Sequence, residues 1–382
     1  MSLPRLVIVR EQVEDREIAN WLPLRDHVDI DVVTTRSRGP YAASGLGLPV
    51  RRLPSRGQRL GPWERIPRRL LDRRLDLDPV VGLEQAVRSA DLLVVNETHL
   101  ASSAQAAALR AGGGPPVLVV CYENIPFRYE DDARLLERKR LVRAHADHFV
   151  ALTGGARRAL EREGVDRGRI STVTYGVDPV LFARGDRDSV RREWGVGDDV
   201  VVLYAGRLLR EKGLVPLVDA FTALRAGVRV GTMLVLAGDG PERGRIVEAA
   251  HALGIGDRVK LVPWVARERV PHLLAAADVY AMPSLPTPYW EEQLGFSMIE
   301  AMAAGLPVLG TDGGCIPEIL GGTGVLAPPY QRRALAAALE TLVTDEGLRA
   351  RLGAAARARV GHHLSTGVAA SGLHDVVMRL IG

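Results

Sequence analysis

Short apolar runs alternate with longer amphipathic stretches along most of the chain. Apolar runs of strand length, bounded by Gly, Pro or polar residues, are typical of strands buried in a parallel sheet, and the stretches between them predict helices. Strands and helices that alternate in this way indicate a doubly wound α/β domain. In the first half the predicted strands are residues 6–9, 29–34, 92–96, 117–121, 149–152 and 170–175, and the clearest helices are 101–111 and 130–146.

The second half repeats this alternation after a connecting segment at residues 176–199. We therefore expect two α/β domains with parallel sheets, at residues 1–180 and 181–365, and an amphipathic C-terminal helix within 366–382 that packs back on the first domain. Two open sheets that face each other would form a crevice at the carboxyl ends of their strands, where ligands usually bind. The predicted strands of this half are residues 200–204, 233–236, 259–262, 279–282 and 307–310, and its predicted helices include 242–253, 267–277, 295–304, 332–343 and 346–359.

The most informative polar pattern surrounds the predicted helix at residues 295–304, which Gly305 and Pro307 end. The helix start offers free backbone N–H groups and the positive end of the helix dipole, which suit a phosphate. Glu292 and Glu300 bracket this start with seven residues between them, and a carboxylate is a good acceptor for neutral hydroxyls. The arrangement suits a nucleotide sugar, which carries a diphosphate between two hydroxyl-bearing groups. Two surface glutamates on an ordinary helix are the alternative.

A second cluster of charge lies on a strand-to-helix connection that reads YAGRLLREKG and carries Arg207 and Lys212. Both cations would lie at the carboxyl edge of the sheet, where arginine can bind two phosphate oxygens and lysine adds a point charge. Solvated surface charges are the alternative for this loop taken alone. The helix start at Gly295, in the same domain, favours the phosphate interpretation.

Composition narrows the class of protein. Hydrophobic residues make up 47% and charged residues 25% of the 382 residues, as in an ordinary globular protein, and the net charge of +4 does not favour nucleic-acid binding. Two cysteines, Cys121 and Cys315, are too few for a disulfide framework or a zinc site. No apolar run approaches the length of a membrane helix or of a signal peptide, so we expect a reducing, cytoplasmic location.

An arginine-rich stretch at residues 51–74, from Arg51 to Arg74, interrupts the α/β pattern. It predicts either a patch for an anionic acceptor or for the inner face of a membrane, or a solvated loop and helix. The apolar residues interleaved with its arginines are Leu60, Trp63, Ile66, Leu70 and Leu71.

Several segments together resemble the retaining glycosyltransferases of family 4, which have the GT-B fold of two facing Rossmann-like domains. The resemblance covers residues 146–343 and is weaker before them. Its most specific parts are the Glu-x7-Glu element and the EAMAAGLPV run. It implies that residues 1–180 form the acceptor-side domain and that residues 181–365 bind the nucleotide sugar. The segments that carry it are ADHFVALTGGARRALEREGVDRGRISTVTYGVDPVLF, YAGRLLREKG, LVLAGDGPE, HLLAAADVYAMPS and EEQLGFSMIEAMAAGLPVLGTDGGCIPEI.

The resemblance also implies roles for individual residues of the donor site. Arg207 and Lys212 would hold the diphosphate, Glu292 would contact the transferred sugar, and Glu300 would bind the ribose. The other expected donor contacts are the backbone near Leu294, Gly295 and Phe296, the loop that holds the base at Trp264 and Val265, and the turn at Gly240.

The sequence departs from the family pattern at several positions. Cys315 stands where the family usually has the second glycine of a Gly-Gly pair, and Trp264 replaces a common glycine of the base loop. The first strand continues as REQVEDRE, without the usual Gly-rich turn. The family often has a histidine close to the transferred sugar where this chain reads CYENIPF, so Glu123 or Asn124 takes that place or the role is absent. His99, in NETHL, is either a further acceptor-side residue or a structural histidine.

Asp-x-Asp pairs bind a divalent metal in the other major glycosyltransferase fold, and three occur here. One begins a predicted buried strand and the others lie in charged, loop-like segments, so we interpret all three as structural and expect no metal site. The pairs are Asp29 with Asp31, Asp76 with Asp78, and Asp186 with Asp188.

The sequence therefore predicts a retaining glycosyltransferase that needs neither a metal nor another cofactor. It would move a hexose-type sugar from a nucleotide-diphosphate sugar to a glycan, lipid or small-molecule acceptor. Glu292, Arg207, Lys212 and Glu123 are its expected catalytic residues. A sugar-nucleotide epimerase or hydrolase of the same fold, and a non-catalytic nucleotide-sugar binding protein, are the alternatives.

Overall fold

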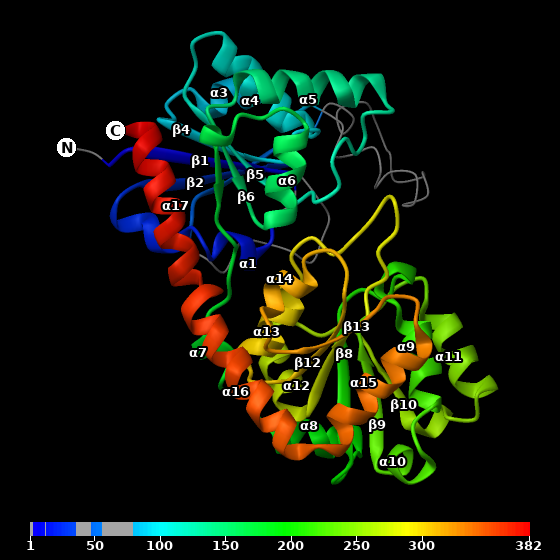
Figure 1. Cartoon of the computed structure of the whole chain (residues 1–382). Coiled ribbons are helices and arrows are strands. Elements are labelled where there is room, and N and C mark those ends of the chain that lie inside the picture. The colour runs from blue at the N-terminus through cyan, green and yellow to red at the C-terminus, as the bar shows by residue number, and fades with distance from the viewer. Residues whose placement is uncertain (1–2, 12, 36–46, 56–78) are drawn as a thin grey trace. The chain divides into compact units, whose positions relative to one another are not determined.

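The chain forms two compact units, which Figure 1 shows in a computed structural model. The structure describes residues 3–11, 13–35, 47–55 and 79–382. Unit 1 comprises Met1–Tyr175 together with Thr366–Gly382, and unit 2 comprises Gly176–Ser365.

A seven-stranded sheet forms the centre of unit 1, with the strand order β3-β2-β1-β4-β5-β6-β7. All neighbouring strands run parallel, and helices connect most of them, as a parallel sheet requires. The strands are β1 (Arg5–Arg10), β2 (Asp29–Thr35), β3 (Val50–Leu53), β4 (Leu92–Asn96), β5 (Val117–Cys121), β6 (His148–Ala151) and β7 (Ile170–Thr172). The main helices are α1 (Asp15–Ile18), α3 (Leu83–Val87), α4 (Ala101–Ala111), α5 (Ala133–His145), α6 (Gly154–Arg162) and α17 (Thr366–Ile381).

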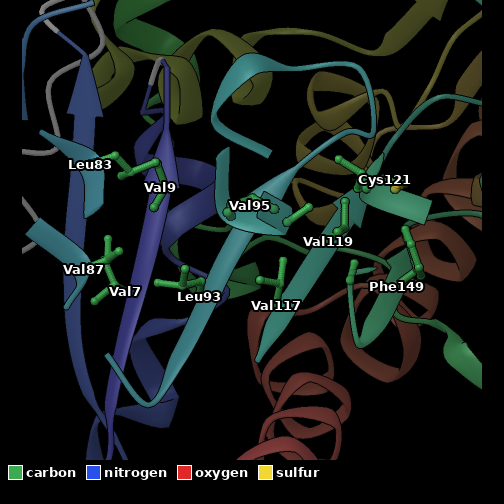
Figure 2. Packing of buried hydrophobic residues seen from close by; sticks show 14 of the residues in the cluster. Val7, Val9, Leu83, Val87, Leu93, Val95, Val117, Val119, Cys121 and Phe149 are labelled. Carbon is green, nitrogen blue, oxygen red and sulfur yellow. The ribbon is translucent and has the colours of Figure 1, made fainter. Parts of the chain in front are cut away.

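One face of this sheet and the helices over it form a continuous hydrophobic core (Figure 2). Alternate strand residues such as Val7, Leu93 and Val119 belong to this core, and α3 adds Leu83 and Val87. A strand in such a sheet is buried on both faces, so its sequence is almost continuously apolar. This is the physical reason why the apolar runs identify the strands.

Unit 2 is built in the same way on a six-stranded sheet with the order β10-β9-β8-β11-β12-β13. Its strand pairs are also all parallel. The strands are β8 (Val200–Ala205), β9 (Thr232–Ala237), β10 (Val259–Val262), β11 (Val279–Met282), β12 (Val308–Thr311) and β13 (Val325–Ala327). The helices are α7 (Pro179–Phe182), α8 (Arg187–Trp194), α9 (Leu214–Thr222), α10 (Ala226–Val230), α11 (Arg243–Ala252), α12 (Val270–Ala276), α13 (Phe296–Ala303), α14 (Ile316–Leu320), α15 (Arg332–Thr344) and α16 (Glu346–His363).

Residues 176–199 are not a simple connection, as the sequence pattern suggested, because they contain α7 and α8. Asp178 and Asp186 cap these helices with their side chains, and α8 packs on α12. The amide of Val177 donates to the carbonyl oxygen of Leu364, so this segment already belongs to unit 2. The division between the units therefore lies at Tyr175 and Gly176, somewhat before the boundary expected at residue 180.

The last helix, α17, belongs to unit 1 although it follows the whole of unit 2 in sequence (red in Figure 1). It contacts β4 and the short 3-10 helix η1 (Leu22–Asp26). Its apolar stripe, which includes Leu373 and Val377, is buried. The chain thus returns to its first unit through this helix.

Candidate active site

Two loops that carry predicted donor residues flank the centre of the unit 2 sheet. β8 pairs with β9 on one side and with β11 on the other, so the chain order reverses between β8 and β11. Loops diverge at such a switch point and leave room for a ligand at the carboxyl ends of the strands. The loop after β8 carries Arg207 and Lys212, and the loop after β11 carries Glu292. Strand order therefore places these residues at the expected site of an α/β sheet.

Lys212 and Glu292 form an ion pair across these loops. The Lys212 Nζ atom lies 2.6 Å from Glu292 Oε2, and only 13% and 9% of the two side chains are exposed. The Ser284 hydroxyl donates to the same carboxylate oxygen over 2.9 Å. The Lys212 ammonium also lies 4.8 Å from the centroid of the Trp290 ring, which is a cation–π contact. Buried charges need compensation of this kind, and the contacts hold both side chains at the switch point.

The segment after β12 fixes the backbone of Glu292. The Cys315 amide donates to the Glu292 carbonyl oxygen over 2.9 Å. Gly314 has a φ of +57°, and a Cβ atom there would lie only 2.5 Å from that oxygen, so glycine is required. The close backbone contact therefore falls at Gly314, and the replacement at Cys315 does not disturb it. Cys315 is buried, and burial, followed by the charge of Glu292, raises the pKa of its thiol.

The helix α13 begins next to Glu292. Its N-cap residue, Gly295, has a left-handed backbone and no side chain that could cap the helix. Leu294 and Phe296 on either side are buried and anchor this end. Tyr280 ties α13 to the sheet, because its hydroxyl donates to the Ala205 carbonyl oxygen over 3.1 Å and lies 2.9 Å from the Ser297 Oγ atom of α13. The positive end of the α13 dipole therefore lies at the site and favours an anion.

Arg207 is held in place through its backbone, by the turn after β9. The Leu208 amide donates to the Asp239 carbonyl oxygen over 2.9 Å, and the Tyr204 hydroxyl donates to the Arg207 carbonyl oxygen over 2.8 Å. A Cβ atom at Gly240 would lie 2.4 Å from the Leu208 carbonyl oxygen, so Gly240 supports this loop. The Arg207 side chain is exposed and makes no hydrogen bond or ion pair with the parts of the chain that the structure describes. Its guanidinium is available to a ligand.

Glu300 pairs with an arginine that the sequence analysis did not select. The Arg267 Nη1 atom donates to Glu300 Oε1 over 2.8 Å, and 35% of the Arg267 side chain but only 4% of the Glu300 side chain is exposed. Arg267 begins the 3-10 helix η8 (Arg267–Arg269), directly after the loop in which Trp264 is exposed and Val265 is half-buried. Arg267 follows a loop at the carboxyl end of β10, and this position in the sequence could have indicated it as a site residue.

Glu123 and Asn124, the acceptor-side candidates of unit 1, are held by local contacts. The Glu123 carboxylate lies 3.3 Å from the Arg128 guanidinium and accepts from the Ile125 amide over 3.0 Å. The Thr153 hydroxyl donates to the Asn124 Oδ1 atom over 2.8 Å at the start of α6. Both residues thus have structural partners, and a catalytic role for Glu123 stays a prediction.

His99 lies beside Tyr129, with 4.4 Å between the ring centroids. Burial, followed by the charge of Lys139, lowers the pKa of His99 to about 3, so its ring is neutral near pH 7. A half-buried, neutral ring that lies tilted against a tyrosine fits the structural interpretation of this histidine.

Glu97 is a carboxyl group at the same edge of the unit 1 sheet that sequence reasoning missed. It follows β4 directly, and its Oε1 atom accepts from the Tyr122 amide over 2.7 Å and from the Glu123 amide over 3.2 Å. Burial, followed by the negative charge of Glu123, raises the pKa of Glu97 to about 8. This edge of the unit 1 sheet therefore contains a carboxyl group that is largely protonated at neutral pH.

The remaining sequence motifs have ordinary structural surroundings where they are described. Asp31 pairs with Arg5, and Asp186 accepts from the Ser189 amide as the cap of α8. Asp76 and Asp78 lie outside the described residues, as does most of the stretch at 51–74, of which only residues 51–55 are described.

Within residues 3–11, 13–35, 47–55 and 79–382, no three His, Cys, Asp or Glu side chains come together as a metal site. None of the helices in these ranges is long and apolar enough to cross a membrane.

Comparison with known proteins supports the class that this geometry defines. The family profile described as glycosyl transferases group 1 matches residues 186–359, and the profile of the glycosyl transferase 4-like domain matches residues 13–176. The D-inositol 3-phosphate glycosyltransferase of Nocardiopsis dassonvillei is 30% identical over 86% of this chain and 80% of that protein. The enzyme of the same name from Nocardia farcinica is 32% identical over 68% of this chain, but the match spans only 55% of the relative.

Solved structures share the fold over almost the whole chain. Anabaena HepE superimposes with a TM-score of 0.80 at 19% identity, and the match covers 99% of this chain and 100% of the HepE chain. The sucrose-phosphate synthase of Thermosynechococcus elongatus gives a TM-score of 0.75 at 22% identity, covering 99% of both chains. Two α/β units, each built on a parallel sheet, are the architecture of the GT-B fold. The chain belongs to the glycosyl transferases of group 1, and the family and fold expected from the sequence are confirmed.

Proposed function

We propose that the protein is a retaining glycosyltransferase that moves a hexose-type sugar from a nucleotide-diphosphate sugar to a hydroxyl-bearing acceptor. The observation that carries this proposal is the Lys212–Glu292 pair, which lies at the switch point of unit 2 beside the start of α13. A cation and a helix N-terminus suit the diphosphate, and a neighbouring carboxylate suits the hydroxyls of a sugar.

The charge that develops during the reaction explains the cations of the site. As the glycosidic bond breaks, the nucleoside diphosphate leaves with an added negative charge and the anomeric carbon gains oxocarbenium character. Lys212, the available guanidinium of Arg207 and the start of α13 would stabilise the leaving group, which is how preorganised charge lowers a barrier. In this proposal they do so without a metal ion, and the acceptor attacks from the face that the leaving group vacates.

The relatives support sugar transfer and guide the choice of substrates. The relatives from Nocardia farcinica and Nocardiopsis dassonvillei are named as D-inositol 3-phosphate glycosyltransferases, and another, from Streptomyces kanamyceticus, is named as an alpha-D-kanosaminyltransferase and is 30% identical over 44% of this chain. The HepE structures were solved with UDP, with UDP and glucose, and with UDP-glucose. Uridine-diphosphate sugars and polyol or aminoglycoside acceptors are therefore the first to test.

The test is a panel of nucleotide-diphosphate sugars incubated with the purified protein, with and without candidate acceptors and with excess EDTA. We expect an acceptor-dependent glycoside, detected by mass spectrometry, with the anomeric configuration of the donor in the NMR spectrum and an undiminished rate in EDTA. Free sugar released without an acceptor would instead indicate a hydrolase, and an isomerised donor an epimerase. Donor binding without turnover would identify a binding protein. Rate collapse in EDTA that Mg²⁺ or Mn²⁺ reverses would contradict the metal-independent mechanism.

A further inference from the structure

The ion pair between Arg267 and Glu300 links two parts of the donor site that are distant in sequence. Glu300 is a buried carboxylate in α13, and Arg267 begins η8 directly after the loop expected to hold the base. Both groups belong to unit 2, so their geometry depends on one compact unit only. In the donor site that the family resemblance implies, the pair lies between the base and the ribose of a bound nucleotide.

The Arg267 guanidinium is held by Glu300 on one side and is still partly exposed. One Nη1 hydrogen bond of 2.8 Å holds it to Glu300, and its guanidinium lies 5.9 Å from the centroid of the ring of Phe182 in α7. A guanidinium carries five N–H donors, and the remaining ones make no hydrogen bond to the described residues. With about a third of the side chain exposed, these donors are accessible to a ligand.

The chemistry of the pair suits recognition of a ribose diol. A carboxylate with a fixed orientation can accept hydrogen bonds from both hydroxyls. A carboxylate buried as deeply as Glu300 needs a partner that compensates its charge, and Arg267 is that partner. Arg267 occupies one acceptor position of Oε1, leaves Oε2 for the diol, and can donate a further N–H to a ribose oxygen.

We propose that Arg267 is a positioning residue that makes Glu300 a selective receptor for the ribose of the nucleotide, against 2′-deoxyribose. The inference rests on the proposed function and deepens it. The Arg267–Glu300 pair persists in the nucleotide complex, with the diol bound to Glu300 and the guanidinium beside the 2′-oxygen. The site therefore selects a ribonucleoside diphosphate through two residues from different loops.

Calorimetric titration with ribo- and 2′-deoxyribonucleoside diphosphates tests this proposal. UDP, GDP and ADP are measured first, and the tightest binder is then compared with its 2′-deoxy form. We expect the wild type to prefer the ribonucleotide by about 10–100-fold, the usual worth of hydrogen bonds to a charged group. Arg267→Ala should bring this ratio close to one by weakening the ribonucleotide alone, and Arg267→Lys should restore part of it.

Controls separate this role from a merely structural one. Arg269→Ala removes a neighbouring arginine of η8 that pairs with Glu193 at the surface and should keep the wild-type ratio. Arg267→Ala combined with Glu300→Gln should lose no more selectivity than Glu300→Gln alone, because the two residues act as a unit. Melting temperatures show whether each variant is folded.

Three outcomes would overturn the inference. In the first, Arg267→Ala weakens ribo- and deoxyribonucleotides equally, which would make Arg267 a general phosphate or folding residue. In the second, Arg267→Ala binds the ribonucleotide more tightly, which would make Arg267 a competitor of the ribose. In the third, the wild type binds no nucleoside diphosphate, and the proposed function then fails together with this inference. The first two outcomes leave the proposed function intact.

Discussion

At the scale of single residues, the two cations expected to bind the diphosphate differ in their contacts with the protein. The Lys212 ammonium contacts both the Glu292 carboxylate and the Trp290 ring, so a phosphate at the start of α13 would compete with Glu292 for the same cation. Arg207 makes no such contact among the described residues and is exposed. Two cations expected to serve one diphosphate therefore differ in what they contribute to the fold.

This difference predicts a loss of stability for only one of two substitutions that have similar effects on rate. Arg207→Ala and Lys212→Met should each lower kcat by about 10²–10³-fold, the usual cost of losing one preorganised donor. Only Lys212→Met should lower the free energy of unfolding, by about 3 kcal/mol, which is the low end for an uncompensated buried charge because Ser284 still donates to Glu292. Initial rates and urea denaturation measure the two effects. Equal loss of stability in both variants would contradict the assignment.

The shifted pKa values of unit 1 predict how its stability depends on pH. The pKa of Glu97 is raised from 4.5 to about 8, so its contribution is complete below about pH 4.5 and is lost as the pH rises towards 8. The pKa of His99 is lowered from 6.5 to about 3, so its contribution is complete above pH 6.5 and is lost on acidification. Between pH 6.5 and 8, only Glu97 of this pair changes its contribution.

We therefore expect the melting temperature of unit 1 to fall between pH 6.5 and 8 in the wild type. Glu97→Gln should flatten this decline, because the amide oxygen still accepts from the Tyr122 amide but carries no titrating proton. Glu84→Gln, at an exposed position of α3, is the matched control and should keep the wild-type slope. Scanning calorimetry measures the melting temperature of each variant. If the melting temperature of Glu97→Gln fell as steeply between pH 6.5 and 8 as that of the wild type, another group would be responsible.

At the scale of elements, the loop after β8 depends on the turn after β9. Two backbone hydrogen bonds join Leu208 to this turn. The Leu208 amide donates to the Asp239 carbonyl oxygen, and the Glu242 amide donates to the Leu208 carbonyl oxygen. Gly240 completes the contact because a side chain there would collide with the Leu208 backbone. The loop that carries the cations of the site is therefore positioned by the turn after β9, which is not itself expected to bind the phosphates.

Two glycine substitutions test this dependence. Gly240→Ala should lower the free energy of unfolding by about 1–3 kcal/mol through overpacking, and it should weaken nucleoside diphosphate binding because the Arg207 loop shifts. Gly244→Ala, in α11 with nothing within 4 Å of the added Cβ atom, should stabilise by up to about 1 kcal/mol and keep the affinity. Denaturation and calorimetry report both quantities. Normal binding by Gly240→Ala would mean that the loop tolerates the shift.

At the scale of the whole molecule, α17 makes the fold of unit 1 depend on the last residues of the chain. It contacts β4 and η1, the His374 ring lies 4.6 Å from the His27 ring, and a Cβ atom at Gly372 would lie 3.1 Å from Val173. These contacts join segments that are hundreds of residues apart in sequence. Unit 1 is therefore complete only when α17 has been made.

A pair of substitutions in α17 should affect unit 1 selectively. Leu373→Ala, at a fully buried position, should destabilise by about 2–5 kcal/mol and lower the thermal transition of unit 1 while that of unit 2 stays in place. Asp375→Ala, at an exposed position of the same helix, should change stability by no more than about 0.5 kcal/mol. Scanning calorimetry measures both effects. If Leu373→Ala lowered the thermal transition of unit 2 instead, α17 would contribute to the stability of unit 2 and the prediction would be wrong.

The sequence by itself determined the class of fold and the chemical character of the site. Apolar runs identified β4, β5, β10 and β11 with the observed bounds. The runs of β4, β5 and β11 are continuous because these strands are buried on both faces. The segment around Glu292 and Glu300 indicated the family, which the comparisons confirm. The same pattern missed the short helices of residues 176–199 and the three-residue strand β13, because they leave too few periodic positions. It missed β3 because Arg51 and Arg52 in this strand are polar and exposed.

Only the tertiary structure decided which charges meet. Strand order brings the loop after β8 next to the loop after β11, so Lys212 finds Glu292 although 80 positions separate them in sequence. In the same way Arg267 reaches Glu300 from 33 positions away, and α17 returns to unit 1. Local periodicity reports only whether a residue is buried within its own element. The partner of a buried charge depends on the order of strands in the sheet, which is set by the packing of the whole unit and has no local signature in the sequence.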